Sequence, residues 1–242
     1  MNEKPKLIYK YTGFEAAESI LSNCALKFTN PKIFNDPFDC DVSGLYFNLN
    51  GTIDPKVQKE ILQLKKDFFP AVLDNKLLAK MYEEVIVEKL SKTVITCFST
   101  EQKNHLLWSH YAQNHTGICL GFNNEIALRD KFIDLTLGME GTVSYGYDEK
   151  VNFVEDKLRG YYKLYLTKLK PWEYEKEYRL IALQDEGLYH FKKEFLCEVI
   201  FGLRVPKEHI DRIIRVCKRC NLENLRFLKA EIKYSEIAYL NI

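Results

Sequence analysis

The chain has 242 residues, of which 46% are hydrophobic and 29% charged, and its formal net charge is +1. Its 15 tyrosines and 15 phenylalanines supply enough apolar surface for a buried core, which excludes an intrinsically disordered protein. The near-neutral charge argues against a domain that holds nucleic acid mainly by bulk electrostatics. Residues 1–6 are polar rather than an apolar signal core, and no stretch reaches the roughly 18 apolar residues that span a bilayer. We therefore expect a cytoplasmic protein without a membrane anchor.

Seven cysteines are scattered among apolar neighbours, which suits buried thiols in a reducing compartment better than a disulfide framework. Cys217 and Cys220 have zinc-knuckle spacing, but a structural zinc site needs four ligands and the sequence has no second pair. His105, His110 and His115 are five residues apart, so they lie on different faces of any helix. Glycine-rich phosphate loops are also absent from the sequence. We therefore expect no metal centre.

The first part of the chain predicts a strand, a helix and a second strand. The strand lies at 7–11, and Thr12 and Glu15 have the spacing of a capping box that opens a helix. A short strand at 25–28 follows. The loop at 29–41 contains Asn-Asp-Pro, in which the proline biases the residue before it away from helical geometry.

A helical insertion is predicted over 54–91. Asp54 and Pro55 form a cap followed by a proline, which is typical of a helix start. Apolar residues then recur at helical spacing in two stretches. The stripe of the first helix comprises Val57, Ile61, Leu64 and Phe68, and that of the second, at about 75–90, comprises Leu77, Leu78, Met81 and Val85.

Strands and helices are interspersed irregularly in the rest of the chain. The predicted strands lie at 94–98, 117–122, 142–147, 177–183, 195–202 and 226–234, and the predicted helices at 105–112, 154–169 and 206–217. Because there is no regular βαβ repetition, an α+β fold is favoured over a doubly wound one. We predict a single domain over 1–242, with a mixed or mostly antiparallel sheet flanked by helices and the helical insertion within it.

Four segments are richer in aromatic and charged residues than a strand or helix requires. They are YKYT at 9–12, FNDPFD at 34–39, CFST at 97–100 with LWSHYA at 107–112, and KPWEYEKEYR at 170–179. Each has an ordinary structural explanation, in strand tyrosines, turn chemistry, helix packing or an exposed charged face. Their concentration in a small protein nevertheless indicates that they line a pocket.

These motifs, together with GICLGF at 117–122 and EVIFG at 198–202, make the chain resemble the prokaryotic domain-of-unknown-function 2971 family. The resemblance extends from about residue 7 to residue 202. It implies little about activity, since the family is named for lacking an assigned function. A toxin or phage-defence setting is the biological context that it suggests.

The order of three elements also resembles the Arg–Ser–Glu layout of ADP-ribosyltransferases. Lys10 stands where that layout has an arginine, Ser99 and Thr100 match its Ser-Thr element, and Glu175-Lys-Glu177 matches its Glu-x-Glu element. An ammonium is a point charge, whereas a guanidinium clamps a phosphate bidentately. The lysine is therefore a departure that weakens the implied grip on NAD.

This resemblance implies an enzyme that breaks the N-glycosidic bond of NAD, with NAD as substrate and no certain cofactor. Breaking that bond builds positive charge on the ribose, which Glu177 would stabilise. Glu175 would orient or deprotonate the acceptor, Ser99 would position the ribose, and Lys10 would position a phosphate. The other candidate residues are His110 for proton transfer, Tyr11, Trp108 and Tyr111 for stacking, and Asn35, Asp36 and Arg179 for substrate binding.

Two other classes of function stay open. In a protein that processes nucleic acid, Asp36, Asp39, Glu175 and Glu177 would hold Mg²⁺, with Lys176 and Arg179 near phosphates. In a non-catalytic binding module, the aromatic residues would line a pocket and the carboxylates would recognise an amine or a sugar. A structure in which the candidate residues of all four segments face one cleft would favour an enzyme.

Overall fold

The computed structural model describes residues 5–67, 74–127, 132–146, 149–222 and 224–242. Spatial contacts gather the chain into two compact units. Unit 1 comprises residues 1–29, 94–142 and 174–242, and unit 2 comprises residues 30–93 and 143–173. The chain therefore passes between the units four times, and neither unit is one continuous stretch. A single domain over 1–242 stays a prediction.

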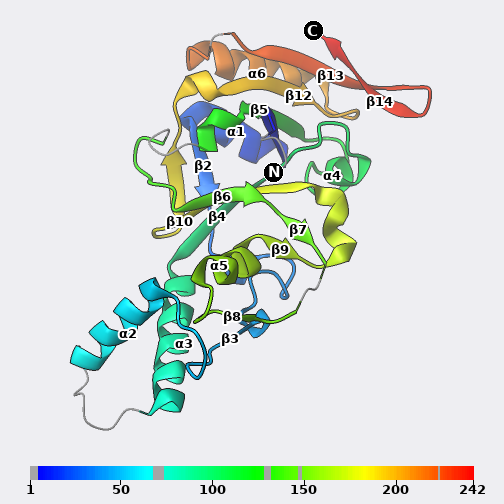
Figure 1. Ribbon diagram of the computed structural model, residues 1–242. Coiled ribbons are helices and arrows are strands. Elements are labelled where there is room, and N and C mark those ends of the chain that lie inside the picture. Colours follow the sequence, from blue (N-terminus) through cyan, green and yellow to red (C-terminus); the bar gives the residue numbers. More distant parts are fainter. Residues whose placement is uncertain (1–4, 68–73, 128–131, 147–148, 223) are drawn as a thin grey trace. The chain divides into compact units, whose positions relative to one another are not determined.

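An eight-stranded sheet is the frame of unit 1 (Figure 1). Its strands, in spatial order, are β14 (Glu236–Asn241), β13 (Arg226–Lys233), β12 (Leu196–Phe201), β5 (Ile118–Asn123), β1 (Leu7–Thr12), β4 (Thr93–Ser99), β10 (Glu177–Leu183) and β6 (Met139–Thr142). The central strand β1 runs antiparallel to β5 from Leu7, opposite Asn123, to Thr12, opposite Ile118. Within this sheet β12 and β13 are parallel, and α6 (Lys207–Arg219) connects them. The predicted α+β fold with a mostly antiparallel sheet is confirmed.

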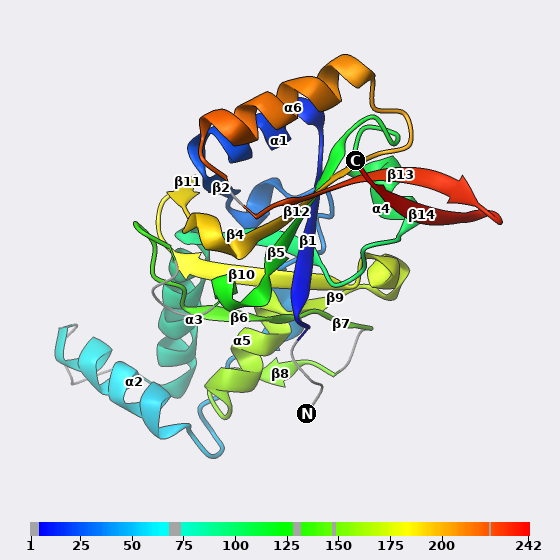
Figure 2. The same cartoon turned by 90° about the horizontal axis from the view of Figure 1, so that it is seen from above.

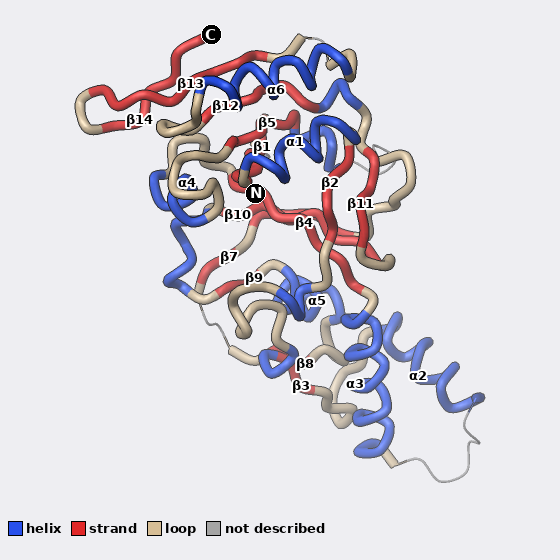
Figure 3. Tube along the Cα trace, turned by 180° about the vertical axis from the view of Figure 1, so that it is seen from behind, coloured by secondary structure: helices blue, strands red, loops and turns tan. Residues whose placement is uncertain are grey.

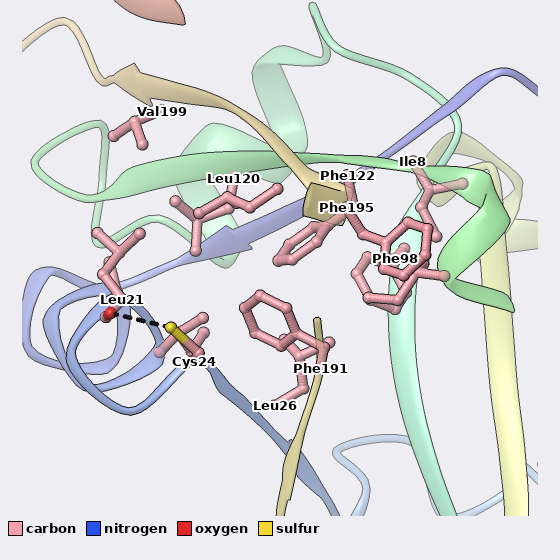
Figure 4. Close-up of a cluster of buried hydrophobic side chains, with 14 of the residues drawn as sticks. Ile8, Leu21, Cys24, Leu26, Phe98, Leu120, Phe122, Phe191, Phe195 and Val199 are labelled. Atoms are coloured by element: carbon pink, nitrogen blue, oxygen red, sulfur yellow. Dashed lines mark hydrogen bonds between the residues drawn. The ribbon is translucent and has the colours of Figure 1, made fainter. Parts of the chain in front are cut away.

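The main core of unit 1 lies between the sheet and the helices α1 (Phe14–Asn23) and α6 (Figure 2). Phe98, Leu120 and Phe122 from the strands meet Leu21 of α1 and Leu26 in this core (Figure 4). Each such side chain contributes about 1.5–3 kcal/mol by leaving water. A two-stranded sheet of β2 (Ala25–Phe28) and β11 (Gly187–His190) borders the same core.

A second, smaller core covers the opposite face of the sheet, where α4 (His105–His110) packs. Trp108 is fully buried there and meets the ring of Tyr11 edge-on, with 5.2 Å between the ring centroids. Its indole Nε1 donates to the hydroxyl of Tyr239 at 3.3 Å. None of the helices in the described ranges has the length and apolar content that crossing a bilayer requires.

The described residues of unit 2 form three α-helices and two short strand pairs. The helices are α2 (Pro55–Asp67), α3 (Asn75–Ser91) and α5 (Lys157–Tyr165), and the strand pairs are β3 (Leu45–Tyr46) with β8 (Val151–Asn152), and β7 (Ser144–Tyr145) with β9 (Thr167–Lys168). Glu60 of α2 joins the helices, since it accepts from the hydroxyl of Tyr82 at 2.7 Å and also binds the ammonium of Lys157.

The two helices predicted over 54–91 are present, but the buried stripe of α3 differs from the predicted one. The buried residues of α3 are Leu78, Tyr82, Ile86 and Leu90, whereas Leu77 is 45% exposed and Met81 and Val85 are half-buried. One narrow stripe cannot bury both Leu77 and Leu78, and the later positions follow Leu78 at helical spacing. In α2, Val57 and Ile61 are buried as predicted. Phe68 and the side chain of Leu64 lie outside the described residues.

Other differences concern short elements. The strand predicted at 142–147 is replaced by β6, which ends at Thr142, and by β7, while residue 147 lies outside the described residues. The helix predicted at 154–169 is α5, which begins after Asp156, whose carboxylate accepts from the backbone NH of Arg159. β11 and β14 were not predicted. β14 follows a turn in which Tyr234 and Ser235 have φ of 50° and 62° without any glycine, so the usual signal for a hairpin is missing.

Candidate functional site

The predicted Ser-Thr and Glu-x-Glu elements lie in direct contact in unit 1. Ser99 ends β4, and its hydroxyl donates to the carbonyl of Glu175 at 2.6 Å. The backbone NH of Thr100 donates to the carbonyl of Lys176 at 2.8 Å. Lys176 has a φ of 45°, a left-handed conformation that costs on the order of 1–3 kcal/mol for a residue with a side chain. The end of β4 thus holds a strained backbone between Glu175 and Glu177.

The buried carboxylate of Glu175 accepts a hydrogen bond from a more exposed tyrosine. Only 5% of Glu175 is exposed, whereas Tyr111, at the end of α4, is 36% exposed. The hydroxyl of Tyr111 donates to Glu175 Oε1 at 2.5 Å. The pair therefore connects a buried carboxyl group to a side chain that solvent can reach.

A second hydrogen-bonded pair lies beside the first in sequence. His110 Nδ1 and the hydroxyl of Tyr174 are 3.0 Å apart. His110 is exposed, and Tyr174 is half-buried. If Nδ1 accepts, Nε2 carries the proton and can donate it, and in the other tautomer Nε2 can accept one. His110 is therefore chemically able to act as an acid or as a base.

Asn104 holds α4 against the segment before β10, a role that the sequence analysis missed. Its Oδ1 accepts from the backbone NH groups of Leu106 and Leu107, at 3.0 and 3.2 Å, and so caps the helix. Its Nδ2 donates to the carbonyl of Tyr174 at 2.5 Å. An asparagine directly before a predicted helix is an N-cap signal, but nothing in the spacing indicates the bond to Tyr174.

Glu177 and Arg179 form a buried ion pair on the same face of the sheet as Ser99. Tyr178 and Leu180 belong to the main core, so Glu177 and Arg179 point to the opposite face. Arg179 Nε and Nη2 donate to the two carboxylate oxygens, each at 2.9 Å. Both side chains are almost completely buried. Glu177 is therefore engaged by a guanidinium, and Tyr111, which solvent reaches, bonds to Glu175.

Lys10 lies on the other face of the sheet from Ser99. Ile8 belongs to the main core and Tyr9 to the smaller one, so alternation along β1 places Lys10 on the main-core side. Its ammonium lies 5.2 Å from the ring centre of Phe98, which is part of the main core. The structure thus does not bring Lys10 to a common face with Ser99 and Glu177, because residues one apart in a strand face opposite ways.

Tyr11 and Trp108 take part in packing. The hydroxyl of Tyr11 donates to the carbonyl of Glu101 at 2.8 Å, and burial raises the pKa of this tyrosine above its ordinary value. Trp108 is fully buried against Tyr11. As placed, these two rings are covered by protein, and of the three predicted stacking residues only Tyr111 has substantial exposure.

Asn35, Asp36 and Asp39 belong to unit 2. Asp36 is buried, and its Oδ1 accepts from the backbone NH of Phe38 at 3.0 Å, as expected for turn chemistry. Asp39 forms a buried ion pair with Lys168 at 3.5 Å. Asn35 is exposed. The FNDPFD segment therefore has a structural role within its own unit, as part of a loop that an ion pair secures.

The described ranges contain no cluster of three or more histidine, cysteine or carboxylate groups that could hold a metal ion. All seven cysteines are free thiols. Cys217 is buried in α6, and Cys220 caps that helix. The carboxylates proposed for Mg²⁺ are divided between the units, with Asp36 and Asp39 in unit 2 and the two glutamates in unit 1.

The chain matches a family of known sequences over part of its length. Residues 107–180 match a family described as "Protein of unknown function (DUF2971)". The chain is similar to this family there. The match covers less than a third of the chain, from α4 to the first half of β10, and thus contains His110, Tyr111, Tyr174 and Glu175. It supports part of the resemblance expected over 7–202. No curated protein and no solved structure matches the chain, and nothing in these comparisons supports the resemblance to ADP-ribosyltransferases.

Proposed function

We propose that α4 and the segment before β10 form an acid–base site that acts on the N-glycosidic bond of a nucleotide, with NAD as the first substrate to test. The observation that carries the proposal is the clamped backbone at Glu175 and Lys176. Ser99 and Thr100 hold it in a left-handed conformation. Strain of this kind is concentrated at functional sites, where the surrounding structure maintains it.

Glu175 and Tyr111 are the groups best suited to the reaction. Breaking a glycosidic bond builds positive charge on the sugar, which a nearby carboxylate stabilises. The bond from Tyr111 links the buried carboxyl group of Glu175 to a side chain that solvent can reach. His110, paired with Tyr174, is able to move a proton to or from the acceptor or leaving group. In this proposal Ser99 is a positioning residue, since its hydroxyl is bonded to the backbone of Glu175.

The resemblance implies that Glu177 stabilises the charge on the ribose, but in this proposal Glu177 has a positioning role. Its two oxygens accept from Arg179 inside the protein. We therefore assign it to positioning β10, and assign to Glu175 the charge stabilisation that was expected of Glu177.

The test is to incubate the protein with NAD and to measure nicotinamide release by chromatography. Removing one group that stabilises the charge of a transition state typically lowers the rate by about 10²–10³-fold. We expect losses of this order in Glu175→Gln and Tyr111→Phe. The matched controls are Glu125→Gln and Tyr234→Phe, which change exposed residues of unit 1 and should keep the wild-type rate.

Circular dichroism of each variant separates loss of chemistry from loss of fold. Absence of NAD turnover in the wild type, or turnover that both site variants retain, would overturn the proposal. Binding of NAD without any product would instead favour the non-catalytic module.

A further inference from the structure

A groove runs between α1 and α6, on the main-core side of the sheet. Figures 1 and 3 show the two helices side by side from opposite directions. The groove is lined by Glu18, Ser19 and Ser22 from α1 and by Arg212, Arg215, Val216 and Arg219 from α6. It lies on the opposite face of the sheet from α4, and therefore apart from the proposed acid–base site.

The three arginines follow from the sequence of α6. The apolar side of this helix faces the core and carries the buried residues Ile213, Val216 and Cys217. Arg212, Arg215 and Arg219 recur at intervals of three and four residues, which places them along one flank of the buried stripe. The helix thus presents a row of guanidinium groups along one side of the groove.

One arginine of the row is neutralised within the groove. Arg212 donates to both carboxylate oxygens of Glu18, at 2.6 and 2.7 Å, and its guanidinium lies 5.5 Å from the ring centre of Phe14. The other carboxylate near Arg212 is that of Glu15. This pair cancels the one negative charge that lines the groove.

The other two arginines have no such partner. Neither Arg215 nor Arg219 forms an ion pair with a carboxylate in the part of the chain that the structure describes. Both are exposed. Four residues of α-helix rise about 6 Å, so the two Cα atoms are about that far apart along the axis. The groove therefore presents two guanidinium groups that form no ion pair among the described residues, with two serine side chains opposite.

We propose that this groove binds the phosphoryl groups of a phosphate-bearing ligand. A guanidinium presents parallel NH donors that match two oxygens of a phosphate, and it stays charged at all physiological pH values. The hydroxyls of Ser19 and Ser22 provide neutral donors on the facing wall. Two cations spaced along the helix suit a ligand with two phosphates, such as pyrophosphate or adjacent phosphates of a nucleic-acid strand.

The experiment is a calorimetric titration of the whole protein with sodium pyrophosphate and, in a second arm, with a short single-stranded oligothymidylate, both at constant ionic strength. The test variant is Arg215→Gln with Arg219→Gln. The matched control is Lys207→Gln with Lys218→Gln, which removes the same charge from exposed positions of the same helix outside the groove. We expect the test variant to weaken binding on the order of tenfold or more, and the control to bind as the wild type does.

The two arms identify the source of the phosphate. Pyrophosphate binding at least as tight as oligothymidylate binding, per site, indicates a small phosphorylated molecule. Tighter oligothymidylate binding, with an affinity that falls steeply with salt, indicates a nucleic-acid backbone. Failure of both ligands to bind at millimolar concentration, or equal weakening in both double variants, would overturn the proposal. Loss of NAD turnover through Glu175→Gln leaves this result unaffected, since the groove lies on the other face of the sheet.

Discussion

Lys10 is an ammonium held inside unit 1. It donates to Thr96 Oγ1 at 3.0 Å and to the carbonyl of Cys97 at 2.9 Å. Burial lowers the pKa of Lys10, because removal from water disfavours the charged form, and the nearby Cys97 and Glu177 counteract this only in part. Keeping Lys10 charged at this buried position therefore lowers the stability of the native state, whereas a charged lysine in water would not.

This pKa gives a prediction for stability against pH. The folded-state pKa of Lys10 lies below the value of about 10.4 for an unfolded chain, so between the two values the unfolded state binds more protons. Stability from this residue therefore rises with pH across that range. The free energy of unfolding of the wild type, minus that of Lys10→Met, should increase there when measured by urea denaturation. The exposed Lys6→Met should show no such trend, and a flat or falling difference for Lys10→Met would contradict the prediction.

The sequence could predict which residue types gather at the candidate site, but not how each of them faces. Ser99 and Glu175 were expected together, and they are joined by a hydrogen bond. The orientation of Lys10 could not be predicted, because alternation along a strand shows that neighbours face opposite ways without showing which face carries the larger core. The bond from Tyr111 to Glu175 joins residues 64 positions apart, and local patterns contain no information on such a distance.

Among the helices, α3 has its C-terminal end capped by the side chain of Asn30. The side-chain amide of Asn30 donates to the carbonyls of Leu90, Ser91 and Thr93, at 3.1, 2.9 and 2.9 Å. The last carbonyls of a helix have no partner within the helix, so they need one from elsewhere. Asn30 is almost fully buried, and water does not replace it easily.

We expect Asn30→Ala to lower the free energy of unfolding by about 1–3 kcal/mol, the usual cost of leaving buried polar groups without partners. Asn30→Asp should be at least as harmful, because a carboxylate cannot donate to a carbonyl. Chemical denaturation followed by circular dichroism measures both. The exposed Asn241→Ala should stay within about 0.5 kcal/mol of the wild type, and an equally small effect of Asn30→Ala would show that the amide is dispensable.

Elements with a strong apolar period were predictable, and those without one were not. The burial of Val57 and Ile61 on α2 was predicted from spacing alone and is confirmed. β11 was missed because a short, half-exposed strand has little apolar alternation to detect. The phase of the stripe on α3 was ambiguous, since Leu77 and Leu78 are adjacent and the burial of Leu78 is decided by its tertiary neighbours.

In the molecule as a whole, four of the seven cysteines are core residues. Cys24, Cys40, Cys119 and Cys217 are buried, and the structure contains all seven as free thiols. Burial raises the pKa of the Cys217 thiol to about 12 and that of Cys119 well above its ordinary value. A protonated, buried thiol is a poor nucleophile, so these groups are chemically inert while the fold is intact.

Titration with Ellman's reagent, without any reductant, tests whether the seven thiols are free and whether the buried ones are unreactive. The denatured chain should release seven equivalents of chromophore. The native protein should react quickly at no more than three thiols and fastest at Cys197 and Cys220, because burial raises the pKa of the half-buried Cys97 thiol well above its ordinary value. Fewer than seven equivalents after denaturation would reveal a disulfide, and more than three fast equivalents in the native state would show that the core opens readily.

The central position of β1 has a consequence for synthesis on the ribosome. This strand occupies Leu7–Thr12, while its full-length partner β5 occupies Ile118–Asn123. At roughly 5–20 residues per second, about 5–20 s pass between the translation of the two strands. Until β4 (Thr93–Ser99) is translated, which takes most of that interval, the backbone donors and acceptors of β1 have no native strand to pair with. We therefore expect a nascent chain of this protein to bind a chaperone before β5 has been translated.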